Sequence, residues 1–287
     1  MAKVPRDDEV GLTPEEVRHF VEHGYVLLKK AFSPDTAAAC REFLWDRIAK
    51  DGIDRQNSLT WPEKHWISES YNDVTGDPWT SVLTPRLKRA MDQLCGVDRW
   101  QPDDLTCGWW VLTFPGHAML PWAPAGHWHV DGARYVHHID SKESGLLPIF
   151  LFNDIGPGDG GTALSPGSHH HVAQILQKAV PNGMKGGKVS AMAKAWVHRH
   201  KAQFVETQGE AGDVMLTHPF LMHARSKNCG HEVRFMCNPN VGLKEPMNLK
   251  RDDVSEYSAV ELAIVNGIAA SAAPSKTNKK RKREHET

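Results

Sequence analysis

Three residues in the second half of the chain have the types and spacing of a metal site. His129 and Asp131 lie two positions apart in the segment HWHVDG, and His223 ends the apolar run in GDVMLTHPFLMH. On an extended strand, residues two apart point to the same side, so an imidazole and a carboxylate can hold one ion. Two histidines and one carboxylate on one face of an octahedron leave positions open, which is typical of non-haem Fe(II) oxygenases.

An arginine follows the last of these residues along the chain. Arg234 lies in the strand-like segment EVRFMCNP, between Val233 and Phe235, and such neighbours disfavour an exposed position. A guanidinium binds a carboxylate through two parallel, charge-assisted hydrogen bonds, which a lysine matches poorly. We therefore expect Arg234 to hold the distal carboxylate of a 2-oxoglutarate co-substrate, with a surface ion pair as the alternative.

His127 supports a different set of ligands. It lies two positions before His129, so on a strand His127, His129 and Asp131 would all share one face. His127 and His129 could then join His223 in a three-histidine site, which suits zinc or a cupin-type metal enzyme that does not use 2-oxoglutarate. This scheme leaves Asp131 and Arg234 without roles.

The elements that must position these residues change in character near residue 106. The first part has helix signals, such as Thr13-Pro14 before an apolar stripe that stops at Gly24, and similar starts near Pro34 and Pro85. Later, short apolar runs alternate with Gly and Pro, as in strands of an antiparallel sandwich or barrel: CGWWVLTF, HWHVDG, LLPIFLFNDI, GGTALSPGSHH, AQFVET, DVMLTH and EVRFMCNP. A helix is expected near residues 191–201, and another can begin after the Pro-Gly-Ser turn before His169.

These signals predict a mostly β fold with flanking helices. We expect one domain over residues 1–268, in which a helical portion (1–105) supports a double-sheet jelly-roll core (106–245). Residues 269–287 become small, polar and basic, and are expected to form a disordered tail.

Composition excludes several classes of protein. With 40% hydrophobic and 24% charged residues and a net charge of −1, the chain is typical of a globular protein without a global attraction to nucleic acid or membranes. No apolar run reaches membrane-spanning length, and the five cysteines form no CxxC pair, as in a reduced intracellular protein. We expect a cytoplasmic location. The tail cluster KKRKR is either a nuclear import signal or a solubilising end.

The order and spacing of these motifs resemble those of a known family. HWHVDG, GDGGTALSPGSHH, HPFLMHARSKN and the following arginine are similar to the signatures of the phytanoyl-CoA dioxygenase-like Fe(II)/2-oxoglutarate oxygenases, and TPEEVRHFVEHGYVLLKKAF resembles their opening helix and strand. The resemblance implies a cupin-like double-stranded β-helix with His129, Asp131 and His223 as iron ligands. It also implies Arg234 as the 2-oxoglutarate anchor, with Thr162 and His127 where some members contact the co-substrate.

The resemblance further implies the reaction. Such an enzyme uses dioxygen and 2-oxoglutarate to oxidise a small organic substrate, by default through hydroxylation, and releases succinate and CO2. One departure is Ala224-Arg225-Ser226, which replaces the usual small residue and serine after the distal histidine, so that Arg225 faces either the substrate or solvent. A non-catalytic jelly-roll binding protein and a protein-modifying nuclear oxygenase remain as alternatives.

Overall fold

The N-terminal helices begin and end at the residues that the sequence signals predict. The computed structural model describes residues 10–70, 76–105 and 109–272. In α1 (Pro14–His23), Thr13 and Glu16 form a reciprocal capping box, and Gly24, with a φ of 84°, ends the helix. Ser33 caps α2 (Pro34–Ala49) and Thr84 caps α3 (Pro85–Cys95). Each of these side chains accepts a hydrogen bond from a backbone N–H of the first turn.

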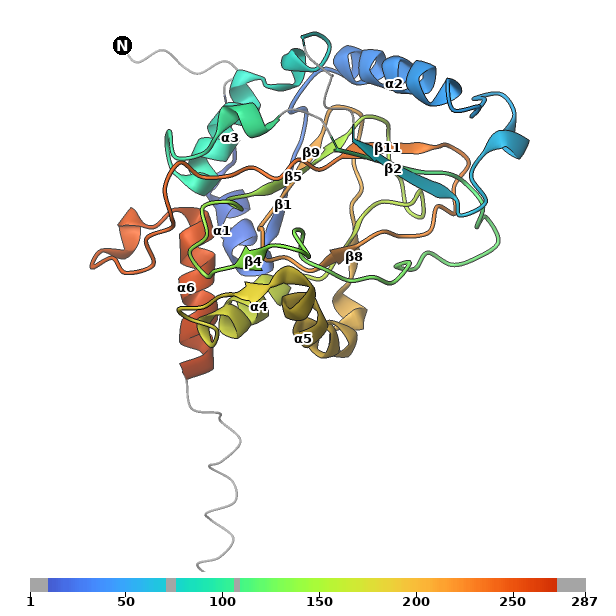
Figure 1. The fold of residues 1–287 in the computed structure, drawn as a ribbon. Coiled ribbons are helices and arrows are strands. Elements are labelled where there is room, and N and C mark those ends of the chain that lie inside the picture. The colour runs from blue at the N-terminus through green and yellow to red at the C-terminus, as the bar shows by residue number, and fades with distance from the viewer. Residues whose placement is uncertain (1–9, 71–75, 106–108, 273–287) are drawn as a thin grey trace, which may run out of the picture.

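The core consists of antiparallel sheets. A six-stranded sheet has the order β1-β9-β5-β11-β3-β2, formed by Tyr25–Leu28, Val214–Thr217, Leu147–Leu151, Arg234–Cys237, Trp109–Thr113 and Trp66–Ser70. A smaller sheet has the order β10-β6-β8, formed by His223–Ala224, Ala163–Leu164 and Val205–Glu206, and β4 (Val136–His137) pairs with β7 (Met184–Lys185). The predicted jelly-roll core with flanking helices is confirmed (Figure 1).

The inner strands β9, β5 and β11 of the large sheet are buried on both faces, which is why their segments are largely apolar in sequence. Side chains alternate along each strand, so Phe235 of β11 packs toward the helices, with its ring centroid 5.2 Å from that of Trp45 in α2. The opposite face carries Ile149, Met215 and Met236, which pack with Leu164 of the small sheet in a separate cluster. Figure 1 shows α2 and α3 on one side of the large sheet, and α4 and α5 on the other.

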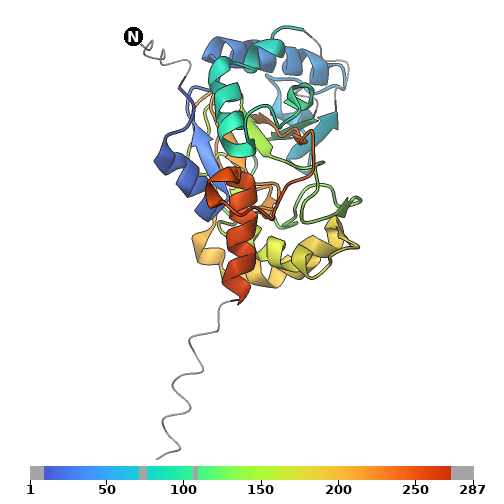
Figure 2. The same cartoon turned by 90° about the vertical axis from the view of Figure 1, so that its left-hand side faces the viewer.

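Besides the two-residue strands β4 and β7, two longer elements were not predicted. Strand β2 lies within the portion expected to be helical, and α6 (Ala259–Ala272) extends through residues 269–272, where the disordered tail was expected to begin. The buried residues Val260, Ala263 and Ile264 explain α6, because they give it an apolar side to pack against α1, α3 and α4 (Figure 2). Residues 273–287 of the expected tail lie outside the described residues.

The remaining helices complete the flanking layer. The helix expected near 191–201 is α5 (Gly186–Arg199), which begins five residues earlier, and α4 (Ser168–Gln177) follows the Pro-Gly-Ser turn as expected. Short 3-10 helices occupy Ser58–Thr60, Thr80–Val82, Pro102–Leu105, Lys201–Gln203 and Val254–Glu256. In the described part of the chain, no helix has the length and apolar character needed to cross a bilayer.

Two histidines are enclosed where α1, α4 and α6 meet. His169 and His218 are almost completely buried, with ring centroids 5.1 Å apart. The Nδ1 atom of His218 accepts a hydrogen bond of 3.1 Å from the Phe220 N–H. Its lone pair is therefore already used, and protonation of this nitrogen would break the hydrogen bond. Burial lowers the pKa of His218 to about 3 and that of His169 well below its usual range.

We therefore expect the protein to lose stability in mild acid. A histidine whose pKa is lower in the folded state contributes stability above the unfolded pKa, near 6.5, and that stability is lost as the pH falls below it. His218 alone should lower the unfolding free energy with a slope that rises from about 0.7 kcal/mol per pH unit at pH 6.5 to about 1.4 kcal/mol per pH unit near pH 5, above the range where carboxylates titrate. Urea unfolding across this window measures the slope. His218→Gln should flatten it, and an equal slope in that variant would show that other groups control the effect.

Candidate metal centre

His129, Asp131 and His223 converge on one point between the two sheets. The backbones of His129 and His223 form an isolated antiparallel bridge, in which each N–H donates to the other carbonyl at 3.0 Å. Oδ1 of Asp131 then lies 3.2 Å from Nε2 of His129 and 3.3 Å from Nε2 of His223. Within the described ranges, these are the residues whose ligand atoms could hold a metal ion, all within 4.8 Å of one another.

Each ligand side chain is oriented by a neighbouring group. Nδ1 of His129 donates to the His127 carbonyl at 2.7 Å, and Nδ1 of His223 donates to the Leu221 carbonyl at 3.0 Å. These bonds select the tautomer that leaves both Nε2 atoms free to bind a metal. Nδ2 of Asn238 donates to Oδ2 of Asp131 at 3.2 Å, so Oδ1 of that carboxylate is directed toward the histidines. The donor set fits a divalent first-row metal.

The electrostatics of the three side chains agree with this fit. Burial opposes the ionisation of Asp131, but His223 and His129 outweigh it and hold the pKa of the carboxyl below its usual range. Burial likewise disfavours a charged His223, but the facing Asp131 raises the pKa of that imidazole. The carboxylate of Asp131 thus stays ionised and can bind a metal cation. A bound cation would replace the proton that Asp131 otherwise shares with the two histidines.

His127 does not join these residues. The expectation that it shares a face with His129 and Asp131 is wrong, because its backbone adopts a left-handed conformation (φ 58°) that breaks the alternation of a strand. Its side chain is exposed, and its backbone carbonyl orients His129 instead. The geometry therefore does not support a three-histidine site.

Arg234 is a buried cation that makes no ion pair with the described residues, although the charge of Glu206 acts on it from a greater distance. It is 1% exposed on β11, where Nη2 donates to Oγ1 of Thr113 at 2.6 Å and Nη1 lies 3.4 Å from Oγ1 of Thr162. Its Nε has no partner, and no carboxylate of the described residues lies within ion-pair distance of it. Burial lowers the pKa of Arg234 to about 9, so the side chain remains charged at neutral pH. An unpaired buried charge is costly, which indicates that the site is built for an anion.

A cavity of about 590 Å³ connects the metal centre to its surroundings. Its lining includes the three candidate ligands and Thr162, together with Trp66, Tyr135 and Arg225. An adjoining cavity of about 410 Å³ shares Asp131, Gly132, Tyr135 and Asn240 with it, so there is space for a small organic molecule beside the metal centre.

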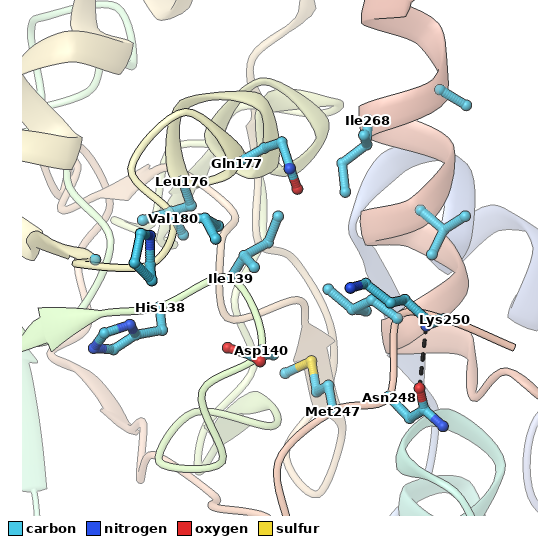
Figure 3. A pocket seen from close by; sticks show the side chains of 15 residues that line it. His138, Ile139, Asp140, Leu176, Gln177, Val180, Met247, Asn248, Lys250 and Ile268 are labelled. Atoms are coloured by element: carbon cyan, nitrogen blue, oxygen red, sulfur yellow. Dashed lines mark hydrogen bonds between the residues drawn. The ribbon is translucent and has the colours of Figure 1, made fainter.

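A cavity of about 740 Å³ lies elsewhere, between the end of α4 and α6 (Figure 3). Its walls include Leu176 and Ile268, with Ile139, Met247 and Lys250 nearby. It contains none of the three candidate ligands. Its larger volume therefore does not mark it as the functional site, since the converging donor atoms line the other cavity, together with Thr162, which contacts Arg234.

The glycine-rich motif GDGGT forms the loop that carries Thr162. The carboxylate of Glu206 accepts hydrogen bonds from the N–H groups of Gly158 (2.8 Å) and Gly161 (3.1 Å). The Ser226 hydroxyl donates to the Gly161 carbonyl at 2.5 Å, so this serine braces the loop and does not point to a co-substrate. The loop is thus held in place from both sides, which fixes Thr162 beside Arg234.

Gly161→Ala should disturb this loop. An added Cβ would collide with the backbone carbonyl of Thr207, which cannot move as a flexible side chain could. We expect a loss of about 1–3 kcal/mol in unfolding free energy, the usual cost of overpacking, measured by urea denaturation. Gly187→Ala is the control, because its methyl group would meet nothing closer than 3.4 Å. Equal stability of the two variants would contradict this interpretation of the loop.

Three residues of the site were not found from the sequence. Thr113 meets Arg234 because the two are partners in the register of β3 and β11. Asn238 directly follows β11, and Trp66 lies on β2, which pairs with β3. Strand register brings Thr113 and Trp66 to the site. The asparagine in EVRFMCNP was the only one of the three with a local signal, because it lies four residues after Arg234 in the same segment.

Comparison with known proteins places the chain in a family. The solved structures include the non-heme alpha ketoglutarate dependent carbocyclase SnoK from nogalamycin biosynthesis (16% identity, 85% of this chain and 89% of that chain covered, TM-score 0.52). They also include EctD from S. alaskensis with bound Fe (20%, 87% and 84%, 0.52) and the epimerase SnoN (14%, 79% and 82%, 0.52). At these identities the likeness shows a shared fold.

The sequence comparisons are more decisive. No curated protein matches this sequence. The model of the phytanoyl-CoA dioxygenase family, however, matches residues 20–236, which include the end of the opening helix, the first strand, the metal centre and the buried arginine. The chain therefore belongs to the phytanoyl-CoA dioxygenase family.

Proposed function

We propose that this protein is an Fe(II)- and 2-oxoglutarate-dependent dioxygenase that oxidises a small organic molecule and releases succinate and CO2. The observation that carries the proposal is the pairing of the His129, Asp131 and His223 cluster with the unneutralised Arg234 in one interior. Two proteins with this fold support it, because EctD is described with bound Fe, and SnoN with Fe3+, alpha ketoglutarate and nogalamycin RO.

Different residues of the chain would bind the iron and the 2-oxoglutarate. His129, Asp131 and His223 would hold the iron, and Arg234 with Thr113 and Thr162 would hold the distal carboxylate of 2-oxoglutarate. When bound, iron and 2-oxoglutarate supply the activation of dioxygen, coupled to decarboxylation. The protein contributes fixed ligand orientation through backbone carbonyls and a fixed, buried cation at Arg234.

Hydroxylation is the outcome that we propose for the substrate. Asp131 occupies the ligand position that a halide would need for transfer to the substrate, so the ligand set disfavours halogenation. The small cavity beside the metal centre favours a small molecule over a folded protein as the substrate.

The proposed function is tested by measuring the binding of Fe(II) and 2-oxoglutarate first and turnover afterwards. Anaerobic addition of Fe(II) and 2-oxoglutarate should produce visible charge-transfer absorption, and admitting dioxygen should yield succinate. Incubation with a metabolite pool, followed by mass spectrometry, should then reveal a product that is one oxygen atom heavier. Absence of both metal binding and 2-oxoglutarate binding would favour a non-catalytic jelly-roll protein.

A further inference from the structure

A second guanidinium faces the cavity of the metal centre without an anionic partner. Arg225 is half-buried, and its Cζ lies 3.7 Å from the centroid of the Trp66 ring. Both side chains line the cavity that contains His129, Asp131 and His223. In the part of the chain that the structure describes, its guanidinium makes no hydrogen bond or ion pair.

The backbone places Arg225 beside the metal centre. Arg225 follows His223 by two residues in an extended segment, where alternate side chains share a face. The pairing that joins His223 to His129 resumes in this segment after a bulge at Gly126 and His127, because the Arg225 carbonyl accepts the Ala125 N–H at 2.7 Å. The position of Arg225 is therefore set by the same backbone pairing that positions a metal ligand.

Stacking on Trp66 orients the guanidinium. A planar cation held flat against an aromatic ring loses its rotational freedom but keeps the N–H donors at its edges. Such an edge matches a carboxylate or a phosphate through parallel charge-assisted hydrogen bonds. Lys64, with its Nζ 4.3 Å from the centroid of the same ring, adds a second positive charge nearby.

The other charges expected in the site cancel one another, so the positive charge of Arg225 has no opposite charge. A divalent metal, the dianion 2-oxoglutarate, Asp131 and Arg234 together have no net charge. Asp131 is the only carboxylate among the described residues that line this cavity, and it is assigned to the metal. Arg225 therefore remains uncompensated in a partly desolvated position, where an opposite charge is stabilised more than in water.

We propose that Arg225, held on Trp66, binds an oxyanion of the substrate and so makes the enzyme selective for acidic molecules. This rests on the proposed function, because it takes the cavity beside the metal centre as the substrate site. The other cavity walls suit an apolar body attached to that oxyanion, since they include Val111, Ala224, Met236 and Pro239. The substrate class is thus an organic acid, or a phosphate ester, with an apolar chain or ring.

Binding measurements on the full chain test this selectivity. The protein is first saturated with Ni(II) and 2-oxoglutarate, which fills the metal centre and Arg234 without turnover. Hexanoate, octanoate and decanoate are then titrated by calorimetry, each against its neutral primary amide, and octyl phosphate against octanoate distinguishes the two oxyanions. We expect the acids to bind at least about ten-fold more tightly than the amides, the effect of one charge-assisted hydrogen bond.

Variants assign the preference to Arg225. Arg225→Gln should remove the difference between acid and amide, and Arg225→Lys should keep part of it. Lys227→Gln is the charge-matched control, because this neighbour does not line the cavity and its loss should leave the preference unchanged. Loading of each variant with Ni(II) and 2-oxoglutarate is measured first, so that a misfolded protein is recognised.

Several results would overturn the proposal. Equal binding of acids and amides, absence of acid binding to loaded protein, or an unchanged preference in Arg225→Gln would each do so. A fall in 2-oxoglutarate affinity in Arg225→Gln as large as that in Arg234→Gln would assign Arg225 to the co-substrate instead. Failure of the wild type to bind Ni(II) and 2-oxoglutarate would contradict the proposed function itself, which is a separate outcome.

Discussion

Replacement of Asp131 by alanine is expected to abolish turnover and to weaken Fe(II) binding more than any other single substitution. Asp131 is the only anionic ligand of the three, and its Oδ1 lies within 3.3 Å of both imidazole Nε2 atoms. Its removal leaves two neutral donors. The loss of affinity should exceed the roughly 10–100-fold that is typical when only an outer partner of a ligand is removed. Anaerobic calorimetry with Fe(II) measures it, and circular dichroism checks the fold.

Two further variants separate a ligand from its surroundings. Asn238→Ala removes only the hydrogen bond to Oδ2 of Asp131, so a smaller loss of about 10–100-fold is expected. His127→Asn should keep most of the affinity, because asparagine tolerates the left-handed conformation and the backbone carbonyl that orients His129 is retained. Loss of the metal in His127→Asn, with retention in Asp131→Ala, would instead establish the three-histidine scheme.

The parts of the fold that depend on neighbours in the sequence could be predicted. Thr13, Ser33 and Thr84 each cap a helix by accepting an N–H three residues later, and a proline follows each of them. Such signals are complete within one turn of helix and need no knowledge of the rest of the chain. The apolar runs likewise identified β3, β5, β9 and β11 of the large sheet, because these strands are buried on both faces, whereas the edge strand β2 has no such run.

The metal centre could be predicted in part, for a similar reason. The spacing of His129 and Asp131 places them together even though their segment contains an isolated bridge and no regular strand. Two residues before His129, the left-handed φ of His127 removes this histidine from the face that His129 and Asp131 share. A periodicity argument has no means to detect one such residue, because histidine adopts this conformation only occasionally.

The contacts across strands could not be predicted. Thr113 reaches Arg234 through strand register, and Trp66 reaches Arg225 from a strand at the sheet edge. Register depends on how strands far apart in the sequence align, and a shift of one residue would turn each of these side chains to the other face. The sequence therefore indicated the candidate metal ligands, but not the residues that support them.

Arg234→Lys is expected to raise the Michaelis constant for 2-oxoglutarate with less change in the maximal rate. Lysine keeps the charge, but it loses the planar fork that holds a carboxylate and the contacts to Thr113 and Thr162. The expected loss is about 1–3 kcal/mol of binding free energy, the scale of a charge-assisted hydrogen bond. Initial rates at varied 2-oxoglutarate measure it, and an unchanged constant would remove Arg234 from the co-substrate site.

Arg234→Met provides a matched measurement that needs no turnover. In the absence of ligands, the wild type holds a buried cation with an unpartnered Nε, so methionine should leave the unfolding free energy equal or higher. Saturating 2-oxoglutarate with Ni(II) should stabilise the wild type, because a ligand that binds only the folded state shifts unfolding. The variant should gain only the share due to the metal. A strongly destabilised Arg234→Met protein would mean that Arg234 is needed for the fold itself, and an equal gain from 2-oxoglutarate in both proteins would mean that the co-substrate binds elsewhere.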